Sequence, residues 1–330
     1  MKWRIRKNMS IHKEVNVVKI VNYRVGNRVR IACQEGEQII DLNGAYLSLL
    51  RKEGKIRAEQ IAEAFIPADS VGFYQGGEES IELAKKAVDY MLTEASEEEK
   101  QAWVFQRSDV KIEAPVINPS KIICVGHNYR DHIQEMGREI PKYPVLFAKF
   151  ANAIIGPEDD IPLFPNVEKL DYEAEFAFVV GKRARNVKEE DALDYVAGYT
   201  IVNDVSARDL QFRTLEWLQG KANDGSAPMG PWLVTKDEIP DPDALEMSLR
   251  VNGEERQRAN TKNLVFNVNR MLSYVSEIMT LEPGDVILTG TPGGVGHARD
   301  PQTYLQDGDV VDIEISGIGK LENTVRKTDF

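Results

Sequence analysis

Residues 170–181, LDYEAEFAFVVG, combine two closely spaced acids with an apolar run. Glu173 and Glu175 lie two positions apart in a strand pattern, so we expect both side chains to point to one face. The adjoining FAFVV segment indicates burial, which is costly for two like charges unless a cation or a proton neutralises them. The alternative is a solvated start of a strand with two exposed acids.

The chain around this segment is rich in short, β-branched runs bounded by glycine, and these predict strands. The runs are KIICVG (121–126), YTIVNDVS (199–206), GPWLVT (230–235), MSLRVNG (247–253), DVILTG (285–290) and VVDIEISGIG (310–319). Helical spacing is confined to residues 128–137, 189–198, 207–220 and 263–279. Because strands and helices do not alternate regularly, we predict an α+β fold in which a mixed sheet forms a β-roll or open pseudo-barrel.

The first third of the chain has a different pattern. Residues 16–41 alternate around turn signals at Gly26-Asn27 and Glu35-Gly36, which predicts two or three strands. Apolar residues at three- and four-residue spacing then predict helices from about 44 to 105. The segment from Ser108 to Pro119 contains two prolines and indicates a junction. We therefore predict a small N-terminal α+β domain, residues 1–115, and a larger catalytic domain, residues 116–330.

Charge and composition restrict the partners. The chain has 330 residues and a net charge of −12 at pH 7, which disfavours nucleic acid and anionic membranes. The basic start MKWRIRKNMSIHKE lacks the apolar stretch of a secretory signal, and no apolar run is long enough for a membrane span. Cys33 and Cys124 are too few for a disulfide framework, so we expect reduced thiols and a cytoplasmic location.

A third acid strengthens the case for a metal site. Asp204 follows the apolar run YTIVN, at the point where a strand gives way to a polar turn. Three carboxylates that leave positions open for water and substrate suit a hard cation, Mg²⁺ or Mn²⁺. The alternative for Asp204 alone is a helix N-cap for the segment that follows it.

The glycine-rich segment TGTPGGVG, residues 289–296, lacks the Lys-Ser/Thr end of a nucleotide phosphate loop and the spacing of a dinucleotide fingerprint. Nucleotide binding is therefore not expected. Such a loop can instead direct backbone N–H groups at a carboxylate, with the hydroxyl of Thr291 as a further donor. The alternative is a tight turn without a ligand.

Seven ordered blocks between residues 121 and 325 resemble the signature of the fumarylacetoacetate hydrolase family. They are VGHNYRDHIQEMG, YPVLFAKF, LDYEAEFAFVVGKRARNV, GYTIVNDVSARDLQ, KANDGSAPMGPW, RVNGEERQ and LEPGDVILTGTPGGVG. The resemblance implies a mixed β-roll, usually dimeric, with Mg²⁺ or Mn²⁺ held by Glu173, Glu175 and Asp204. It also implies that Lys221 lies near the metal and that the substrate contacts Arg208, Gln211 and Thr291.

His132 and Glu135 fall three apart in a helical pattern, so their side chains are neighbours. A carboxylate beside an imidazole raises its basicity, as a water-activating base requires. The alternative is a solvated surface pair. The resemblance implies that both residues lie on a lid segment near 128–142 that closes over the metal.

Three functions remain open. The first is Mg²⁺- or Mn²⁺-dependent hydrolysis or decarboxylation of a small 2-oxo acid, acylpyruvate- or oxaloacetate-like, with Lys221 and the metal stabilising the enolate. The second is enol–keto isomerisation of a 2-hydroxy-dienedioate of the hydroxymuconate type, which needs proton transfer and no activated water. The third is a regulatory protein that retains the fold without turnover.

Overall fold

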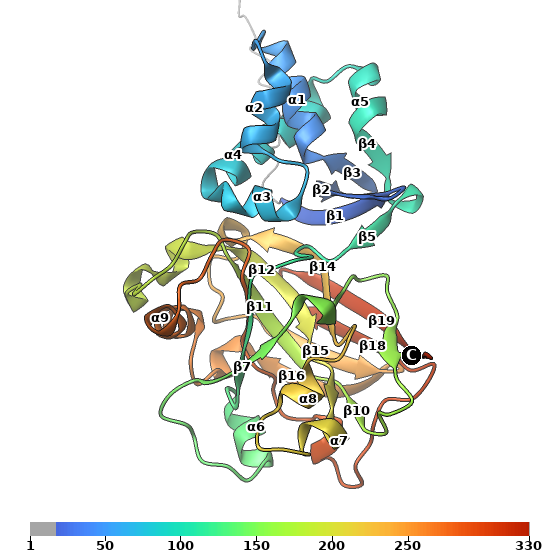
Figure 1. Cartoon of the computed structure of the whole chain (residues 1–330), viewed down its shortest axis with the longest axis vertical. Helices are drawn as coiled ribbons and strands as arrows, with labels where there is room; N and C mark the ends of the chain where they lie inside the picture. The colour runs from blue at the N-terminus through green and yellow to red at the C-terminus, as the bar shows by residue number, and fades with distance from the viewer. Residues whose placement is uncertain (1–17, 330) are drawn as a thin grey trace, which may run out of the picture.

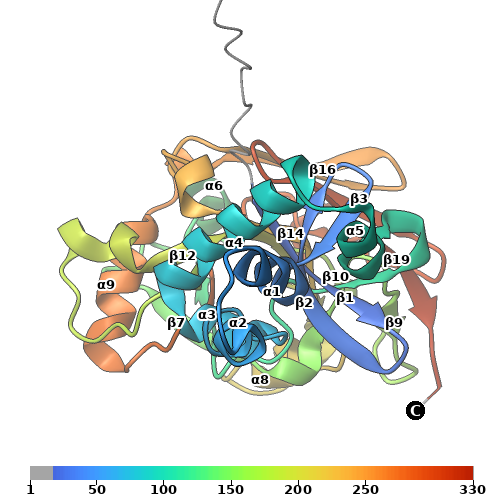
Figure 2. The same cartoon turned by 90° about the horizontal axis from the view of Figure 1, so that it is seen from above.

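The computed structural model describes residues 18–329 and shows a mixed α+β architecture (Figure 1). A helical unit stands at one end of a strand-rich body, and seen from above its helices lie over the first strands (Figure 2). These helices are α1 (Leu42–Lys52), α2 (Ala58–Phe65), α3 (Ser70–Gln75), α4 (Gly77–Thr93) and α5 (Glu97–Trp103). The helices predicted between 44 and 105 are therefore confirmed.

The strands predicted for residues 16–41 are also confirmed within the described range. They form the antiparallel meander β1 (Lys19–Val25), β2 (Arg28–Glu35) and β3 (Gln38–Asp41). The first turn lies at Gly26-Asn27 as expected, and the second lies at Gly36-Glu37, one residue later than predicted. The basic start of the chain lies outside the described residues.

One large mixed sheet joins the first strands to the rest of the molecule. Its order is β4-β3-β2-β1-β14-β12-β11-β17-β6-β7, with β1 antiparallel to β14 and β17 parallel to β6. The further members are β4 (Val104–Gln106), β5 (Lys111–Glu113), β6 (Ile122–Gly126), β7 (Val145–Lys149), β8 (Ile154–Ile155), β11 (Ala174–Val180), β12 (Val196–Asn203), β14 (Ala227–Thr235) and β17 (Val286–Leu288). The sheet stays open rather than closing into a barrel, which confirms the predicted roll.

The core is shared across the predicted domain junction. One buried cluster contains Ile20 and Leu47 from the N-terminal unit together with Val179 and Leu288 from the body. The division at residue 115 thus remains a prediction, since sheet and core both run through it.

A second sheet covers the face of the large sheet opposite the N-terminal helices. Its order is β16-β15-β18-β19-β9, with bounds Glu254–Asn260, Glu246–Val251, Val310–Ile315, Gly319–Lys327 and Ile161–Leu163. Phe176 and Ile201 of the large sheet belong to one core cluster with Leu249 and Ile313 of the second. A short pair, β10 (Leu170–Asp171) with β13 (Ser206–Ala207), lies beside the end of β11.

Helices of the body are short, and two predictions for them were wrong in detail. The helices are α6 (Arg130–Glu135), α7 (Arg208–Gln211), α8 (Leu218–Lys221) and α9 (Val268–Ile278). Residues 207–220 form α7 and α8 separated by a non-helical segment, because Arg208 and Lys221 must both reach the carboxylate of Glu173. Residues 189–198 form a 3₁₀ helix, Glu189–Tyr195, followed by the start of β12. None of the helices in the described part of the chain is long and apolar enough to cross a membrane.

We predict that Asp41→Ala lowers the free energy of unfolding by about 3 kcal/mol, as expected when a buried ion pair loses one partner. Asp41 is fully buried, and its carboxylate accepts from Arg30 Nε at 2.6 Å, Tyr23 Oη at 2.7 Å and Gly44 N at 2.6 Å, the last as the N-cap of α1. Urea denaturation measures the loss.

Asp69→Ala is the matched control, because exposed Asp69 caps α3 through Gly72 N at 2.8 Å and the structure records no ion pair for it among residues 18–329. It should cost about 1 kcal/mol. Equal losses for the two variants would show that the Arg30 and Tyr23 contacts contribute nothing.

Candidate metal centre and its cleft

Strand pairing brings the three predicted carboxylates together. Glu173 immediately precedes β11, Glu175 lies within it, and Asp204 follows β12, its antiparallel neighbour. The backbone N–H of Asp204 donates to the carbonyl of Glu173 at 2.9 Å. One carboxylate oxygen from each of the three residues lies within 4.8 Å of the others, and all three side chains are buried.

Buried cations offset part of this negative charge. Lys221 Nζ donates to Glu173 Oε2 at 2.8 Å and to Asp204 Oδ2 at 2.6 Å. Lys149 Nζ donates to Asp204 Oδ1 at 2.9 Å, and Arg208 Nη2 lies 2.7 Å from Glu173 Oε1. Burial alone would raise the pKa of Glu173, but Lys221 and Arg208 bring that pKa well below its usual range.

Glu175 differs from its two neighbours. Its Oε2 accepts from the backbone N–H of Gly290 at 2.6 Å, and no ion pair to it is found among residues 18–329. Burial, followed by the nearby carboxylates of Asp204 and Glu173, raises the pKa of Glu175 well above its ordinary value. A divalent cation between the three carboxylates would remove this penalty, so the donor set suits Mg²⁺ or Mn²⁺.

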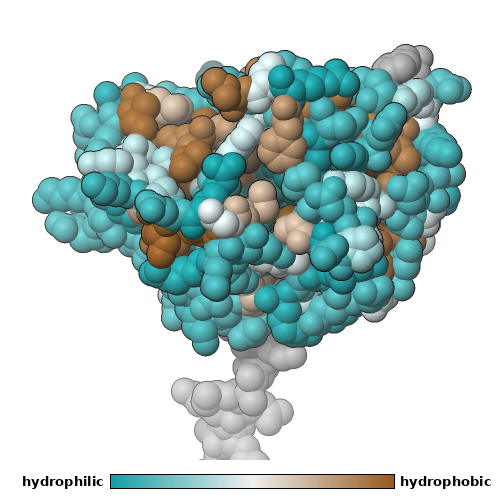
Figure 3. Space-filling view, turned by 90° about the horizontal axis from the view of Figure 1, so that it is seen from below, coloured by the Kyte–Doolittle hydropathy of each residue, from teal (hydrophilic) through white to brown (hydrophobic). Residues whose placement is uncertain are grey.

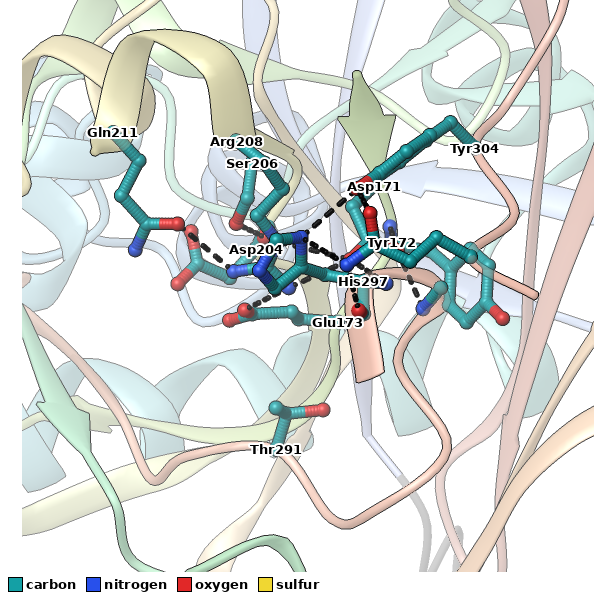
Figure 4. A network of polar contacts seen from close by, with 12 residues as sticks. Asp171, Tyr172, Glu173, Asp204, Ser206, Arg208, Gln211, Thr291, His297 and Tyr304 are labelled. Atoms are coloured by element: carbon teal, nitrogen blue, oxygen red, sulfur yellow. Dashed lines mark hydrogen bonds and ion pairs between the residues drawn. The ribbon is translucent and has the colours of Figure 1, made fainter. Parts of the chain in front are cut away.

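A fourth acid, which the sequence analysis did not single out, holds Arg208 (Figure 4). Asp171 Oδ2 accepts from Arg208 Nε at 2.9 Å, and the backbone N–H groups of Gly296 and His297 also donate to Asp171. Arg208 Nη1 in turn donates to Gln211 Oε1 at 3.0 Å. Arg208 is therefore fixed by its own carboxylate partners before any ligand arrives.

A cleft opens above the carboxylates. Seven of the nine predicted site residues line it: His132, Glu173, Glu175, Arg208, Gln211, Lys221 and Thr291. Asp204 lies beneath this lining, fully buried. Glu135 stands behind His132, with Oε2 at 3.4 Å from His132 Nδ1, and both of its oxygens accept from Gly294 N at 3.1 Å.

The cleft also contains residues that the sequence analysis missed, above all His127, Arg138 and Trp217. Two signals were available for the missed buried charges. Lys149 is a lysine inside the apolar run VLFAKF, and a buried lysine needs a carboxylate partner. Asp171 extends the two-residue spacing of Glu173 and Glu175 by one step toward the N-terminus.

Comparison with known proteins gives consistent results over the same residues. The family described as fumarylacetoacetate (FAA) hydrolase C-terminal matches residues 121–326. The mitochondrial oxaloacetate tautomerase fahd2 of Xenopus laevis is 42% identical over 300 residues, which cover 90% of this chain and 86% of that protein.

Solved structures share the whole fold. The fumarylacetoacetate hydrolase of Exiguobacterium antarcticum is 36% identical with a TM-score of 0.72, and the match covers 94% of this chain and all of that one. Maleylpyruvate hydrolase of Sphingobium, solved with manganese(II) and pyruvate, is 29% identical with a TM-score of 0.69 over 94% of this chain and 99% of that one.

We predict that Glu175→Gln removes metal binding while leaving the fold intact. In the presence of a chelator the variant should melt at or above the wild-type temperature, because a buried group that is costly to ionise becomes a neutral amide that still accepts from Gly290 N. With Mn²⁺ at about 100 times its dissociation constant, the wild type should gain about 2.7 kcal/mol and Glu175→Gln almost nothing. Thermal melting with and without Mn²⁺ measures both effects.

Glu113→Gln serves as the control. Glu113 is another buried carboxylate, paired with Arg24 Nε at 2.5 Å and outside the cleft. This variant should be less stable than the wild type and still gain the full increment from Mn²⁺. A full increment in Glu175→Gln as well would contradict the metal site.

Proposed function

The chain belongs to the fumarylacetoacetate hydrolase family, and we propose that it is a Mg²⁺- or Mn²⁺-dependent enzyme that interconverts the keto and enol forms of a small 2-oxo acid such as oxaloacetate. One observation carries the proposal: Glu173 and Glu175, the ammonium of Lys221 and the imidazole of His132 line one cleft, and Asp204 lies buried beside the two glutamates. The tautomerase named among its relatives supports the choice of reaction.

Tautomerisation moves one proton from C3 of the substrate to the oxygen at C2 and consumes no water. The bound metal would supply Lewis acidity that stabilises the enolate. Lys221 is buried, which by itself would lower its pKa, but Asp204 and Glu173 raise that pKa. It is therefore an ammonium at neutral pH, able to donate a proton or a hydrogen bond to the C2 oxygen.

The proton at C3 needs a base on the cleft wall, and His132 occupies that wall with Glu135 behind it. Burial would raise the pKa of Glu135, but hydrogen bonds from His132 and Gly294 lower it, so this residue stays a carboxylate. A carboxylate at one ring nitrogen orients the imidazole and fixes its tautomer. We assign His132 the transfer of the C3 proton.

The three predicted substrate contacts keep free donors or charge on the cleft. Thr291 Oγ1 accepts from Gln257 Nε2 at 2.8 Å, which leaves the hydroxyl proton to donate elsewhere. Gln211 uses its carbonyl oxygen for Arg208, so its NH₂ group stays available. We propose that both donors bind the substrate carboxylate, whose charge Arg208 also favours.

Hydrolytic or decarboxylating cleavage of a C–C bond in an acylpyruvate or an oxaloacetate-like acid is the second candidate. The His132–Glu135 pair favours it, because the same base could activate a water. Both reactions pass through an enolate and differ in whether water attacks. Isomerisation of a hydroxymuconate-type dienedioate would use the same proton transfer as tautomerisation.

A homodimer and a cytoplasmic location stay predictions. The Xenopus relative carries a mitochondrial designation in its name.

The deciding assay follows the enol absorbance of oxaloacetate with Mg²⁺ or Mn²⁺, together with a coupled measurement of pyruvate. The buffer should itself catalyse the tautomerisation only weakly. Accelerated loss of the enol band without pyruvate, abolished by a chelator, is the expected result. Pyruvate formed in step with the loss would favour decarboxylation, and cleavage of acetylpyruvate would favour hydrolysis. Metal binding without turnover of any of these acids would leave the regulatory alternative.

We predict that Lys221→Met lowers kcat by about 10² with a smaller change in KM, since the ammonium contact strengthens as charge develops on the oxygen. Lys149→Met is the matched control, because Lys149 also contacts Asp204 and does not line the cleft. At saturating metal its kcat should fall far less. Steady-state kinetics of both variants, with metal titrated for each, tests the role; similar kcat values would exclude it.

We predict that His132→Ala and Glu135→Ala each lower the tautomerisation rate, and that the losses in the double variant do not add, because the two side chains act as one unit. The exposed Glu139, in the same segment, gives the control Glu139→Ala, which should match the wild type. Rates come from the enol assay, and metal binding from the Mn²⁺ melting shift. A double variant at the wild-type rate would remove His132 from the mechanism.

A further inference from the structure

The cationic side chains that line the cleft are not equivalent. Arg208 contacts Asp171 and Glu173, and Lys221 contacts Glu173 and Asp204, all between 2.6 and 2.9 Å. Arg138 lines the same cleft, and its guanidinium has no ion-pair partner anywhere in residues 18–329. Arg138 is thus a cleft guanidinium that pairs with no carboxylate of residues 18–329.

His127 gives an independent sign of a ligand on the same wall. Its ring packs edge-on against Trp217, with centroids 5.3 Å apart, and nearly parallel to His132 at 6.3 Å. Its Nδ1 is buried and has no hydrogen-bond partner. Buried polar atoms are nearly always satisfied, so this imidazole carries hydrogen-bonding capacity that no group in the described residues uses.

The backbone holds this imidazole in place at a cost. His127 has φ +53°, a left-handed conformation that is uncommon for a residue other than glycine. The next residue, Asn128, anchors the turn: its amide donates to Phe266 O and Thr289 O, and its Oδ1 accepts from Phe266 N. Strain maintained by three buried hydrogen bonds is typical of a positioned functional side chain.

The two residues interact electrostatically. Burial, followed by the charge of Arg138 and the neighbouring His132, lowers the pKa of His127 to about 4. The ring is therefore neutral at pH 7, with one N–H donor and one acceptor nitrogen. A neutral N–H donor beside a guanidinium is well suited to a carboxylate, whose two oxygens accept from both.

We propose that Arg138 and His127 form a subsite for the second carboxylate of a dicarboxylate substrate, so that the cleft selects 2-oxo dicarboxylates over 2-oxo monocarboxylates. The inference rests on the proposed function for the orientation of the substrate. The acidic triad, Lys221 and Thr291 then bind the 2-oxo carboxylate end, and Arg138 and His127 bind the distal end. The rings of Phe147, Phe212 and Trp217 also line the cleft and limit the size of the acid that it can hold.

Calorimetric titration with malate and lactate in the presence of Mn²⁺ tests the subsite without requiring turnover. These are the 2-hydroxy analogues of oxaloacetate and pyruvate, and they differ by the distal carboxylate. The wild type should bind malate about 10-fold or more tightly than lactate, as one charge-assisted hydrogen-bonded contact provides. Arg138→Gln should lose most of that preference and keep its affinity for lactate within about 2-fold.

His127→Asn should lose a smaller part of the preference for malate, and asparagine is chosen because it tolerates the positive φ. Arg130→Gln is the matched control, since Arg130 is an exposed arginine of α6 outside the cleft. It should bind both acids as the wild type does. Unchanged binding of lactate also shows that each variant is folded.

The outcomes separate the two proposals. A wild type without preference for malate, or an Arg138→Gln variant that retains the preference, would overturn the subsite and identify Arg138 as a solvated arginine at the rim. Loss of the preference in Arg138→Gln supports the subsite even if the enol assay shows no turnover, in which case the proposed function alone fails. Enol turnover together with an unchanged ratio of affinities would retain the function and discard the subsite.

Discussion

The convergence of Glu173, Glu175 and Asp204 within 4.8 Å inside a hydrophobic sheet is the constraint on which the structure depends. The buried cluster contains these three carboxylates and Asp171, and the buried cations in contact with them are Lys149, Arg208 and Lys221. Four acidic groups face three cations, and Glu175 is the acid without a cationic partner in the described part of the chain. Its ionisation is costly, because an unpaired charge is unfavourable in a low-dielectric interior. A divalent cation is the group that would complete this balance and also activate a 2-oxo acid.

Backbone geometry supplies the precision that such a cluster needs. The antiparallel register of β11 and β12 pairs Ala174 with Asn203, which sets Glu173 and Asp204 side by side at the ends of their strands. Gly290 completes the arrangement by donating its N–H to Glu175. It has φ +101°, and a Cβ there would lie 2.8 Å from Val125 O, so a side chain at this position would force the loop away from the carboxylate.

The features that depend on local pattern were predictable, and those that depend on distant contacts were not. Strands alternate or run apolar over five to nine residues, and the spacing of Glu173 and Glu175 is visible within one of them. The break between α7 and α8 was not visible, because it follows from two cations reaching the same carboxylate across the fold. The unpaired state of Arg138 could not be predicted either, since it depends on which acids the fold brings near it.

The sheet carries the carboxylates of the candidate metal site, and the connecting segments carry the proposed base and Arg138. This separation suggests how one fold can serve several reactions. The carboxylates of the candidate metal site belong to strands and strand ends buried in the core, where little can change without loss of the fold. The proposed base lies on α6, a helix of six residues, and Arg138 follows it in an exposed segment. The N-terminal helical unit lies at the opposite end of the body from α6, α7 and α8 (Figure 1). The face that carries these three helices shows scattered apolar patches between hydrophilic residues (Figure 3). In the proposed mechanism, enolate formation uses the buried part and the exposed part decides the fate of the enolate, so substitutions on α6 and its neighbours would change reaction and substrate while the candidate metal site stays constant. Relatives named as a tautomerase and as a hydrolase match this chain over nearly its whole length, which is consistent with one fold serving both reactions.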